Sequence, residues 1–279
     1  MGDTKGGPFE ITADLAAKML AANNPDGRSN ADVVRPWVNG LDLTRRPRDM
    51  WIIDFGVGMT EDEAALYEAP FELVRRVVRP ERVHNKREAY AARWWLHVEP
   101  RSGMRNAFAG LSRYLATPRL TKHRLFVWLD AQVLPDSQII VFARDDDYTF
   151  GVLQSRVHEL WARGMGTQLR EVESGFRYTP TTTFETFPMP DGSLADRERV
   201  AEAAGRLDSL RTKALGMIDH ANPKGRTLTS LYNQRPSWLA NAQADLDRAV
   251  LDAYGWPADL GDEAILERLL ELNLERTPV

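Results

Sequence analysis

Residues 109–130 read AGLSRYLATPRLTKHRLFVWLD. Two apolar segments, at 114–117 and 125–129, flank a run of basic side chains that contains Arg119, Lys122, His123 and Arg124. β-Branched and aromatic residues favour a strand at 125–129, and the proline at 118 suits the end or the edge of a strand. Because strand pairs with cations at their ends can contact a phosphate backbone, this stretch predicts a small sheet and a candidate polyanion-binding surface.

The charge around this stretch is unevenly distributed. Residues 75–124 contain thirteen lysines and arginines but only three glutamates, a net charge of +10, whereas the whole chain has a net charge of −4. The window also holds Trp94, Trp95, His97 and Tyr114. Most charge runs are solvated faces, but basic residues interleaved with aromatic ones favour a nucleic-acid surface. We therefore expect these cations, Arg113 among them, to converge on a lining for a double helix.

The composition limits the class of protein. A chain of 279 residues that is 43% apolar and 27% charged is long enough for one large or two medium globular domains. The chain contains no cysteine, which excludes disulfides, thiolate ligands and cysteine nucleophiles and fits a reducing compartment. Since no segment approaches about 18 uncharged apolar residues and the start has no signal-peptide core, we expect a cytoplasmic protein without a membrane span.

Local signals predict several helices and a small sheet. Before residue 100 they indicate a helix at 11–22 with Thr12 as its N-cap, a strand at 50–55, a helix opened by a Thr60–Glu63 capping box, a further helix at 71–78 and a long basic helix at 81–98. Strands are expected at 114–117, 125–131, 138–143 and 148–153, followed by a helix at 155–165. Apolar residues at helical spacing then predict helices at 194–220, 240–254 and 262–274.

These elements indicate an α+β fold in which a small mixed or antiparallel sheet with flanking helices precedes a C-terminal helical domain. The turn-rich segment PMPDG at 188–192 is the expected boundary. The predicted organisation is a lead-in segment at 1–30, a mixed domain at 31–190 and a helical domain at 191–279.

Two possible ligand sites in the sequence are weak. Residues 51–58 read WIIDFGVG, a strand followed by Gly56-x-Gly58 and a helix, which has the form of a nucleotide or S-adenosylmethionine loop. The helix opens with three acidic residues at 61–63, and no second strand ending in an acid follows, so a plain turn is the better interpretation. A metal site is also poorly supported, because no two of the five histidines are spaced four residues apart, and the acidic run at 145–147 is typical of a turn.

The loop at 167–178 is the better functional candidate. Its side chains can donate to or accept from base edges: arginine to guanine, glutamine to adenine and glutamate to the cytosine amine. The candidates are Gln168, Arg170, Glu171, Glu173, Ser174 and Arg177. A polar surface loop without a binding role explains the same composition equally well.

Several longer strings resemble one family. They are DVVRPWVNGLDLTRRP at 32–47, WIIDF at 51–55, EAPF at 68–71, ATPRLTKHR at 116–124, FGVLQS at 150–155 and FRYTPTTTFETFP at 176–188. Together they resemble the C-terminal half of MmeI-like, or type IIL, restriction-modification DNA adenine methyltransferases. The resemblance implies that the mixed domain is a target recognition domain for double-stranded DNA, with Arg113, Arg119, Lys122, His123 and Arg124 on the DNA backbone and the 167–178 loop on the bases.

In that family the preceding parts bind S-adenosylmethionine, methylate adenine N6 and often include a nuclease. The glycine-rich cofactor loop and the Asn-Pro-Pro-aromatic loop are missing here, so the resemblance implies no cofactor and no catalytic residues in this chain. S-adenosylmethionine would belong to the parent enzyme, whose catalytic domain lies on the same or a separate polypeptide. Two alternatives are a protein-interaction module that docks a catalytic subunit and a complete methyltransferase that uses the Gly56–Gly58 turn.

Overall fold

The computed structural model describes residues 1–168, 175–217 and 225–276. The chain divides into two compact units, and each contains segments distant in sequence. The first unit consists of Met1–Asp42, Pro47–Tyr114 and Leu129–Ala143, and the second of Leu43–Arg46, Leu115–Trp128 and the chain from Arg144 onward. These units differ from the organisation expected from the sequence, because segments on both sides of residue 190 pack together in the second unit.

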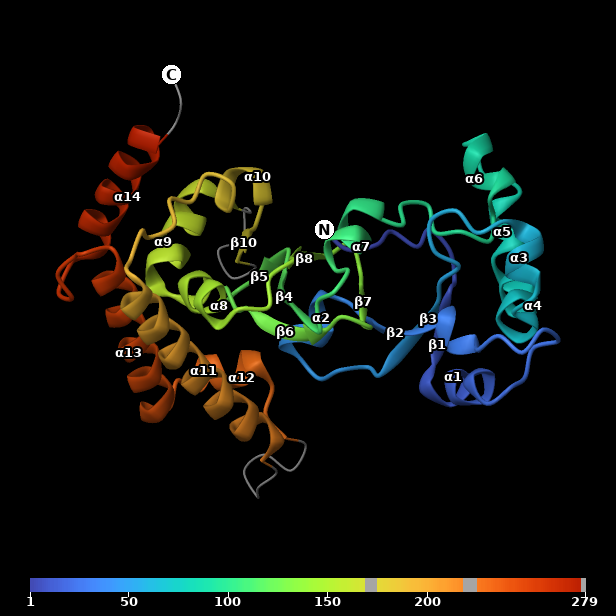
Figure 1. Cartoon of the computed structure of the whole chain (residues 1–279), viewed down its shortest axis with the longest axis horizontal. Helices are drawn as coiled ribbons and strands as arrows, with labels where there is room; N and C mark the ends of the chain where they lie inside the picture. Colours follow the sequence, from blue (N-terminus) through green and yellow to red (C-terminus); the bar gives the residue numbers. More distant parts are fainter. Residues whose placement is uncertain (169–174, 218–224, 277–279) are drawn as a thin grey trace. The chain divides into compact units, whose positions relative to one another are not determined.

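A four-stranded sheet forms the centre of the first unit (Figure 1). Its order is β1-β3-β2-β7, with β1 at Glu10–Thr12, β3 at Met50–Ile53, β2 at Val34–Val38 and β7 at Leu134–Pro135. The pairs with β3 are antiparallel, and β2 pairs with β7 in parallel. Phe9, Trp37, Ile52 and Phe55 lie in the core of this unit. The predicted strand at 50–55 is therefore present, two residues shorter.

Short helices cover the sheet of the first unit. They are α1 (Ala13–Leu20), α2 (Gly40–Thr44), α3 (Glu61–Ala65), α4 (Glu68–Val77), α5 (Arg79–Arg82), α6 (Glu88–Ala92) and α7 (Ser102–Ala107), with a 3-10 turn, η1, at Asn30–Asp32. The last two residues of α2 belong to the second unit. Thr12 caps α1 through its side chain, and Thr60 and Glu63 form the predicted capping box. These caps were readable from sequence because they need residues only three apart.

The predicted long helix at 81–98 is wrong. Only α5 and α6 are helical in this region, and turns separate them. Arg82 is buried and donates to the carbonyl oxygens of Gly6, at 3.2 Å, and Leu96, at 2.5 Å. In a continuous helix Arg82 and Leu96 would be about 21 Å apart, so these bonds require the chain to turn back. The chain therefore forms a compact loop around the buried guanidinium of Arg82 instead of a continuous helix.

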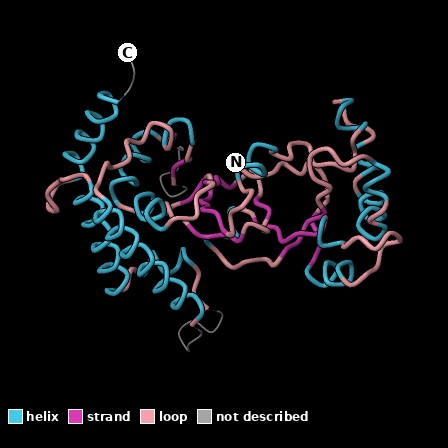
Figure 2. The backbone as a smooth tube through the Cα atoms, viewed as in Figure 1, coloured by secondary structure: helices cyan, strands magenta, loops and turns pink. Residues whose placement is uncertain are grey.

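A second, three-stranded sheet in the order β6-β4-β8 contains two of the points where the chain passes between the units, one in β4 and one in β6. It is formed by β6 (Val127–Asp130), β4 (Arg113–Pro118) and β8 (Ile139–Phe142), which match three of the four predicted strands. A third small sheet, β5-β10-β9, lies entirely in the second unit and consists of β5 (Leu120–Thr121), β10 (Phe176–Arg177) and β9 (Thr167–Gln168). Figure 2 shows how short these strands are beside the helices.

The fourth predicted strand, at 148–153, is a helix instead. The aromatic and β-branched residues that suggested a strand belong to α8 (Asp147–Gln154), which Asp146 caps by accepting from the Thr149 N–H at 2.7 Å. Gly151 lies where α8 meets α11 and α13, and a Cβ there would be 2.8 Å from Val200 Cγ1. Tertiary packing on both sides therefore overrides the strand propensity.

The remaining helices complete the second unit. They are α9 (Arg156–Met165), α10 (Pro180–Thr183), α11 (Leu194–Gly216), α12 (Leu228–Gln234), α13 (Ser237–Ala253) and α14 (Asp262–Arg276). The predicted C-terminal helices are present, and α12 is an additional one. Arg211 of α11 is buried and donates to Gln154 Oε1, at 3.1 Å, and the Phe126 carbonyl, at 2.9 Å, and thereby joins α11 to α8 and to the start of β6.

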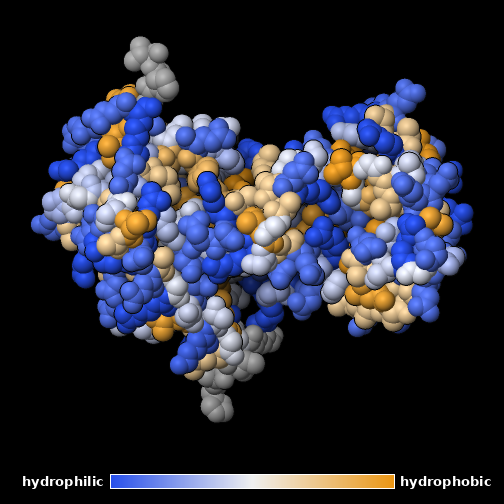
Figure 3. All heavy atoms as spheres, in the orientation of Figure 1, coloured by the Kyte–Doolittle hydropathy of each residue, from blue (hydrophilic) through white to orange (hydrophobic). Residues whose placement is uncertain are grey.

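The surface is mixed in character. Figure 3 shows apolar atoms on the surface over α14, the helix on which Leu270 and Leu274 are 46% and 65% exposed. Of the helices in the described parts of the chain, none is both long enough and apolar enough to span a membrane. The fold class predicted from the sequence is confirmed: small sheets with flanking helices are followed by a helical C-terminal region.

Candidate nucleic-acid interface

The β5-β10-β9 sheet brings together the two stretches that the sequence singled out. β10 pairs antiparallel with β5, with Phe176 opposite Thr121 and Arg177 opposite Leu120. On its other side β10 pairs with β9, with Arg177 opposite Thr167. The Tyr178 N–H also donates to the Arg119 carbonyl at 2.8 Å. The basic run at 119–124 and the ends of the 167–178 loop therefore lie on adjacent strands, although some fifty residues separate them in the sequence.

Gly175 allows the close approach of these strands. Its φ is +83°, and a Cβ at this position would be 2.0 Å from the Thr121 carbonyl oxygen. A side chain would thus meet both a disfavoured backbone conformation and a backbone atom of the neighbouring strand. Glycine has no side chain to contact a base, and the structure shows why it is required at this position.

Arg124 lies beneath this sheet and not on its surface. It is 3% exposed and donates to Thr117 Oγ1, at 3.1 Å, and to the carbonyl oxygens of Phe176, at 3.0 Å, and Pro118. Its guanidinium lies 4.6 Å from the ring centre of Phe176 and 5.0 Å from that of Tyr178. Burial lowers the pKa of Arg124 to about 9, so the side chain is still charged at pH 7. This placement contradicts the expected phosphate contact, because the polar atoms hold β10 against the end of β4.

A buried histidine supports the same strand from below. His158 of α9 is fully buried, with Nδ1 2.9 Å from the Leu153 carbonyl oxygen and Nε2 3.0 Å from the Tyr178 hydroxyl. A carbonyl can only accept, so Nδ1 carries the proton and Nε2 accepts from Tyr178. Burial lowers the pKa of His158 to about 3, which keeps the ring neutral. No sequence pattern could indicate this pair, because His158 and Tyr178 are twenty positions apart.

The other predicted backbone contacts occupy different environments. Lys122 is exposed and His123 is half-buried, and both contact the same side-chain oxygen of Asn233, at 3.2 and 2.9 Å. Arg119 is half-buried in the turn before β5. Arg113 belongs to the first unit, whereas Arg119, Lys122 and His123 belong to the second. The structure therefore brings three of the predicted backbone contacts together on one unit.

The basic window at 75–124 is less positive at the surface than its net charge suggested. Arg75 pairs with Glu72 at 2.7 Å, and Arg101 pairs with Glu99. Arg105 bridges Asp3, at 2.5 Å, and Asp54, at 2.7 Å. With Arg82 and Arg124 buried as well, several of the expected cations are neutralised or enclosed. The expectation that the whole window lines one surface is therefore not supported.

Of the predicted base-contacting residues, Arg177 is the one whose side chain the structure describes. Arg177 is exposed on β10. The backbone of Gln168 pairs with Phe176 in β9. Arg170, Glu171, Glu173 and Ser174 lie outside the described residues. The strands that precede and follow the loop, β9 and β10, are thus neighbours in one sheet, and Arg177 lies in the strand that follows the loop.

The Gly56-x-Gly58 turn is held by internal contacts. Asp54 at the end of β3 accepts from the Gly56 N–H at 3.0 Å and pairs with Arg105. Burial alone would raise the pKa of Asp54, but His97 and Arg105 hold this pKa below its ordinary value. The carboxylate nearest the turn is therefore committed to the core of the first unit.

Asp3, Asp54 and His97 also satisfy a geometric test for metal ligands, since one ligand atom from each lies within 4.8 Å of the others. Their contacts indicate an ion network instead. His97 Nδ1 is 2.9 Å from Asp3 Oδ2, and Nε2 is 3.0 Å from the Ile53 carbonyl oxygen. Both ring nitrogens face acceptors, and Arg105 supplies a second group of donors to the two carboxylates. The cluster lacks an outward-facing lone pair on histidine that a metal would need.

Comparison with known proteins supports a common origin with one group of enzymes. The family model described as "MmeI, target recognition domain" matches residues 7–191. DNA methyltransferase A of Bacillus subtilis (strain 168) is 30% identical over 149 residues, which is 53% of this chain and 16% of that protein. A solved structure of the Type IIL restriction-modification enzyme MmeI in complex with DNA has a TM-score of 0.76 and 20% identity, over 98% of this chain and 35% of that one.

These relatives are much longer than the matched regions, so the comparison concerns one portion of each. The likeness to the solved MmeI structure extends through the C-terminal helices and shows a shared fold. The family match covers both the basic run and the candidate base-contacting loop, as the resemblance in the sequence predicted. This chain belongs to the MmeI target recognition domain family.

Proposed function

We propose that this chain is the DNA-recognition module of a type IIL-like, adenine-N6-specific DNA methyltransferase. The observation that carries the proposal is the β5-β10 pairing, which joins the basic run to the loop rich in base-complementary side chains. Protein–DNA interfaces need both kinds of group in a fixed relation, because phosphate contacts set the register in which other side chains meet the bases. Family membership supports the same assignment.

The two groups have different roles in this proposal. Arg119, Lys122 and His123 contact phosphates, with Arg113 as a further contact from the other unit. Arg177 contacts a base edge, and its guanidinium can bind guanine O6 and N7 together. The neighbouring candidates Gln168, Arg170, Glu171, Glu173 and Ser174 complete the base-contacting set. Arg124 acts indirectly, because it fixes β10 and therefore the position of Arg177.

The parent enzyme supplies the chemistry. The DNA methyltransferase among the relatives supports S-adenosylmethionine as the cofactor of the full enzyme. The partner of this module is then a methyltransferase catalytic domain, on the same or a separate polypeptide. The module would hold the duplex in register while the catalytic domain acts on the target adenine.

Selection from a random duplex pool, followed by fluorescence anisotropy, tests the proposal. Lys122→Ala should weaken binding to all duplexes and make the plot of log K against log salt shallower by about 0.9. Arg177→Ala should instead cost about 1–3 kcal/mol on the selected site and little on others. Arg199→Ala is the matched control, because Arg199 is an exposed arginine of α11 that pairs with Asp196. Equal losses for both interface variants on every duplex would contradict the assigned roles.

Two measurements distinguish the alternatives. Calorimetry with S-adenosylmethionine on this chain should give no binding heat if the Gly56–Gly58 turn is structural, and a saturable heat would support a complete methyltransferase. If duplex DNA fails to bind at low and moderate salt while an isolated catalytic subunit binds, the chain is an interaction module instead.

A further inference from the structure

Helix α12 gathers chain segments that are far apart in the sequence. Thr229 Oγ1 donates to the Thr44 carbonyl at 2.9 Å, and Asn233 Oδ1 accepts from Lys122 and His123. Thr229 and Asn233 are four residues apart, so they share one face of α12 and lie about 6 Å apart along its axis. The segment at 43–46 and the run at 119–124 therefore meet on one face of this helix, and all three belong to the second unit.

The residues gathered there are cationic. Arg45 follows Thr44 and is exposed, Lys122 is exposed, and Arg235 stands exposed at the C-terminal end of α12. Among the residues that the structure describes, none of these three cations forms an ion pair with a carboxylate. Arg45, Lys122 and His123 approach α12 through the contacts of Thr229 and Asn233, and Arg235 lies at the C-terminal end of the helix; we call these four residues the α12 basic face. Unlike Arg82 and Arg105 of the first unit, which are buried or paired with carboxylates, Arg45, Lys122 and Arg235 keep their charge at the surface.

Arg235 has a backbone conformation that arginine does not favour. Its φ and ψ are 42° and 61°, in the left-handed region, and it precedes Pro236. This region suits glycine or asparagine, and a following proline restricts the backbone further. The Arg235 N–H donates to the Leu231 carbonyl at 2.9 Å, which closes the helix end and needs no side chain. An exposed arginine in a strained position, without a packing role, points to a binding role.

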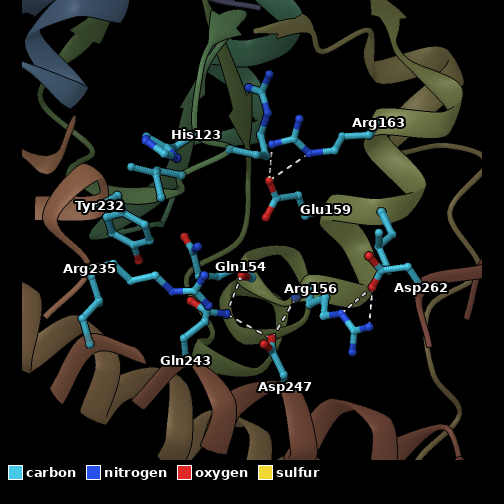
Figure 4. Close-up of a pocket in the computed structure, with 14 residues that line it drawn as sticks. His123, Gln154, Arg156, Glu159, Arg163, Tyr232, Arg235, Gln243, Asp247 and Asp262 are labelled. Atoms are coloured by element: carbon cyan, nitrogen blue, oxygen red, sulfur yellow. Dashed lines mark hydrogen bonds and ion pairs between the residues drawn. The ribbon is translucent and has the colours of Figure 1, made fainter. Parts of the chain in front are cut away.

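The surroundings of Arg235 leave its charge uncompensated. Arg235 and His123 line the same cavity of about 490 Å³ (Figure 4). The carboxylates of that cavity have other partners: Glu159 pairs with Arg163 at 2.6 Å, and Asp262 pairs with Arg156. Asp247 accepts from the Arg156 N–H at 2.8 Å and from Gln243 at 3.0 Å, and burial raises the pKa of Asp247. The acids of the cavity are thus engaged by other groups.

We propose that the α12 basic face binds the sugar-phosphate backbone of duplex DNA, so that the C-terminal helical region shares in holding the duplex. The inference rests on the proposed function and extends it from the recognition strands to α12. The contacts of Thr229 and Asn233 are about 6 Å apart along α12, which is on the order of two phosphates of one strand, since a strand carries a phosphate every ~3.4 Å of helix axis. Asn233 is the positioning residue, because its side-chain oxygen holds both Lys122 and His123.

The test uses this chain and a duplex of random sequence, with anisotropy titrations between 50 and 200 mM KCl. Arg235→Gly should weaken binding severalfold and make the salt slope shallower by about 0.9, while its melting temperature stays at or above that of the unsubstituted chain. Arg235→Gln keeps a residue with a side chain in the left-handed conformation and should give the same shallower salt slope as Arg235→Gly. Arg235→Lys retains the charge and should keep the slope of the unsubstituted chain. Arg206→Ala removes one exposed arginine of α11 and should leave the slope unchanged.

The outcomes separate this inference from the proposed function. If the unsubstituted chain binds duplex DNA and Lys122→Ala weakens it, but both Arg235→Gly and Arg235→Gln behave like Arg206→Ala, the α12 inference alone is overturned. If the unsubstituted chain binds no duplex at any salt concentration, the proposed function fails as well. A loss of folding in Arg235→Gly would contradict the strain argument, and the slope of Arg235→Gln would still decide the DNA contact.

Discussion

Gly175→Ala is the substitution that most directly tests how the recognition strands are held together. Alanine at a φ of +83° carries a backbone cost of about 1–2 kcal/mol. Its Cβ would also be 2.0 Å from the Thr121 carbonyl oxygen, where a carbon and an oxygen normally stay more than about 3.3 Å apart. The strands would have to separate by on the order of 1 Å, which adds about 1–3 kcal/mol. We expect a total loss of roughly 3 kcal/mol in the free energy of unfolding.

Gly255→Ala separates the two contributions. Gly255 follows α13 in the same unit with a φ of +69°, and a Cβ there meets no atom within 4 Å. In urea unfolding followed by circular dichroism, Gly255→Ala should therefore lower the free energy of unfolding by about 1–2 kcal/mol, and Gly175→Ala should lower it by more. Because displacement of β10 also moves Arg177, Gly175→Ala should lose discrimination between the selected duplex and random duplexes. Equal stabilities for the two variants, with unchanged discrimination, would refute the reasoning.

Three further substitutions test the support of the interface. Arg124→Met leaves the carbonyl oxygens of Pro118 and Phe176 without their donor and should lower the free energy of unfolding in urea by about 2–4 kcal/mol. Arg124→Lys should have an intermediate effect. An unchanged free energy of unfolding in both variants would contradict a structural role for Arg124. Because the pKa of His158 is lowered in the folded state, the unfolded state binds a proton at a higher pH than the folded state does. The free energy of unfolding should therefore fall as the pH drops below about 6.5 towards 3, by up to ~1.4 kcal/mol per pH unit. His158→Gln should flatten this pH dependence. Gly151→Ala should destabilise the second unit by about 1–3 kcal/mol, because the new Cβ would contact Val200. Gly205→Ala in α11 is the control: its Cβ would be 3.9 Å from the nearest atom, so the substitution should be neutral or stabilising. The reverse order of the two variants in thermal unfolding would contradict the packing described.

Much of the local structure was predictable because its causes are local. The caps at Thr12 and Ser155 and the capping box at Thr60–Glu63 depend on residues within one helical turn. The strands at β4, β6 and β8 and the C-terminal helices follow from apolar spacing of period two and 3.6. The resemblance to the MmeI family supplied the expected role of the middle of the chain.

The sequence by itself determined most of the element types, the concentration of positive charge and the two stretches that meet at the interface. Only the tertiary structure decided which cations stay at the surface, because burial and pairing depend on residues distant in sequence. Arg124 illustrates the difference: it belongs to the basic run, yet its donors face Phe176, fifty-two residues away. Likewise, residues 148–153 form a helix because Gly151 packs against α11 and α13, and neither contact can be inferred from the propensities of those six residues.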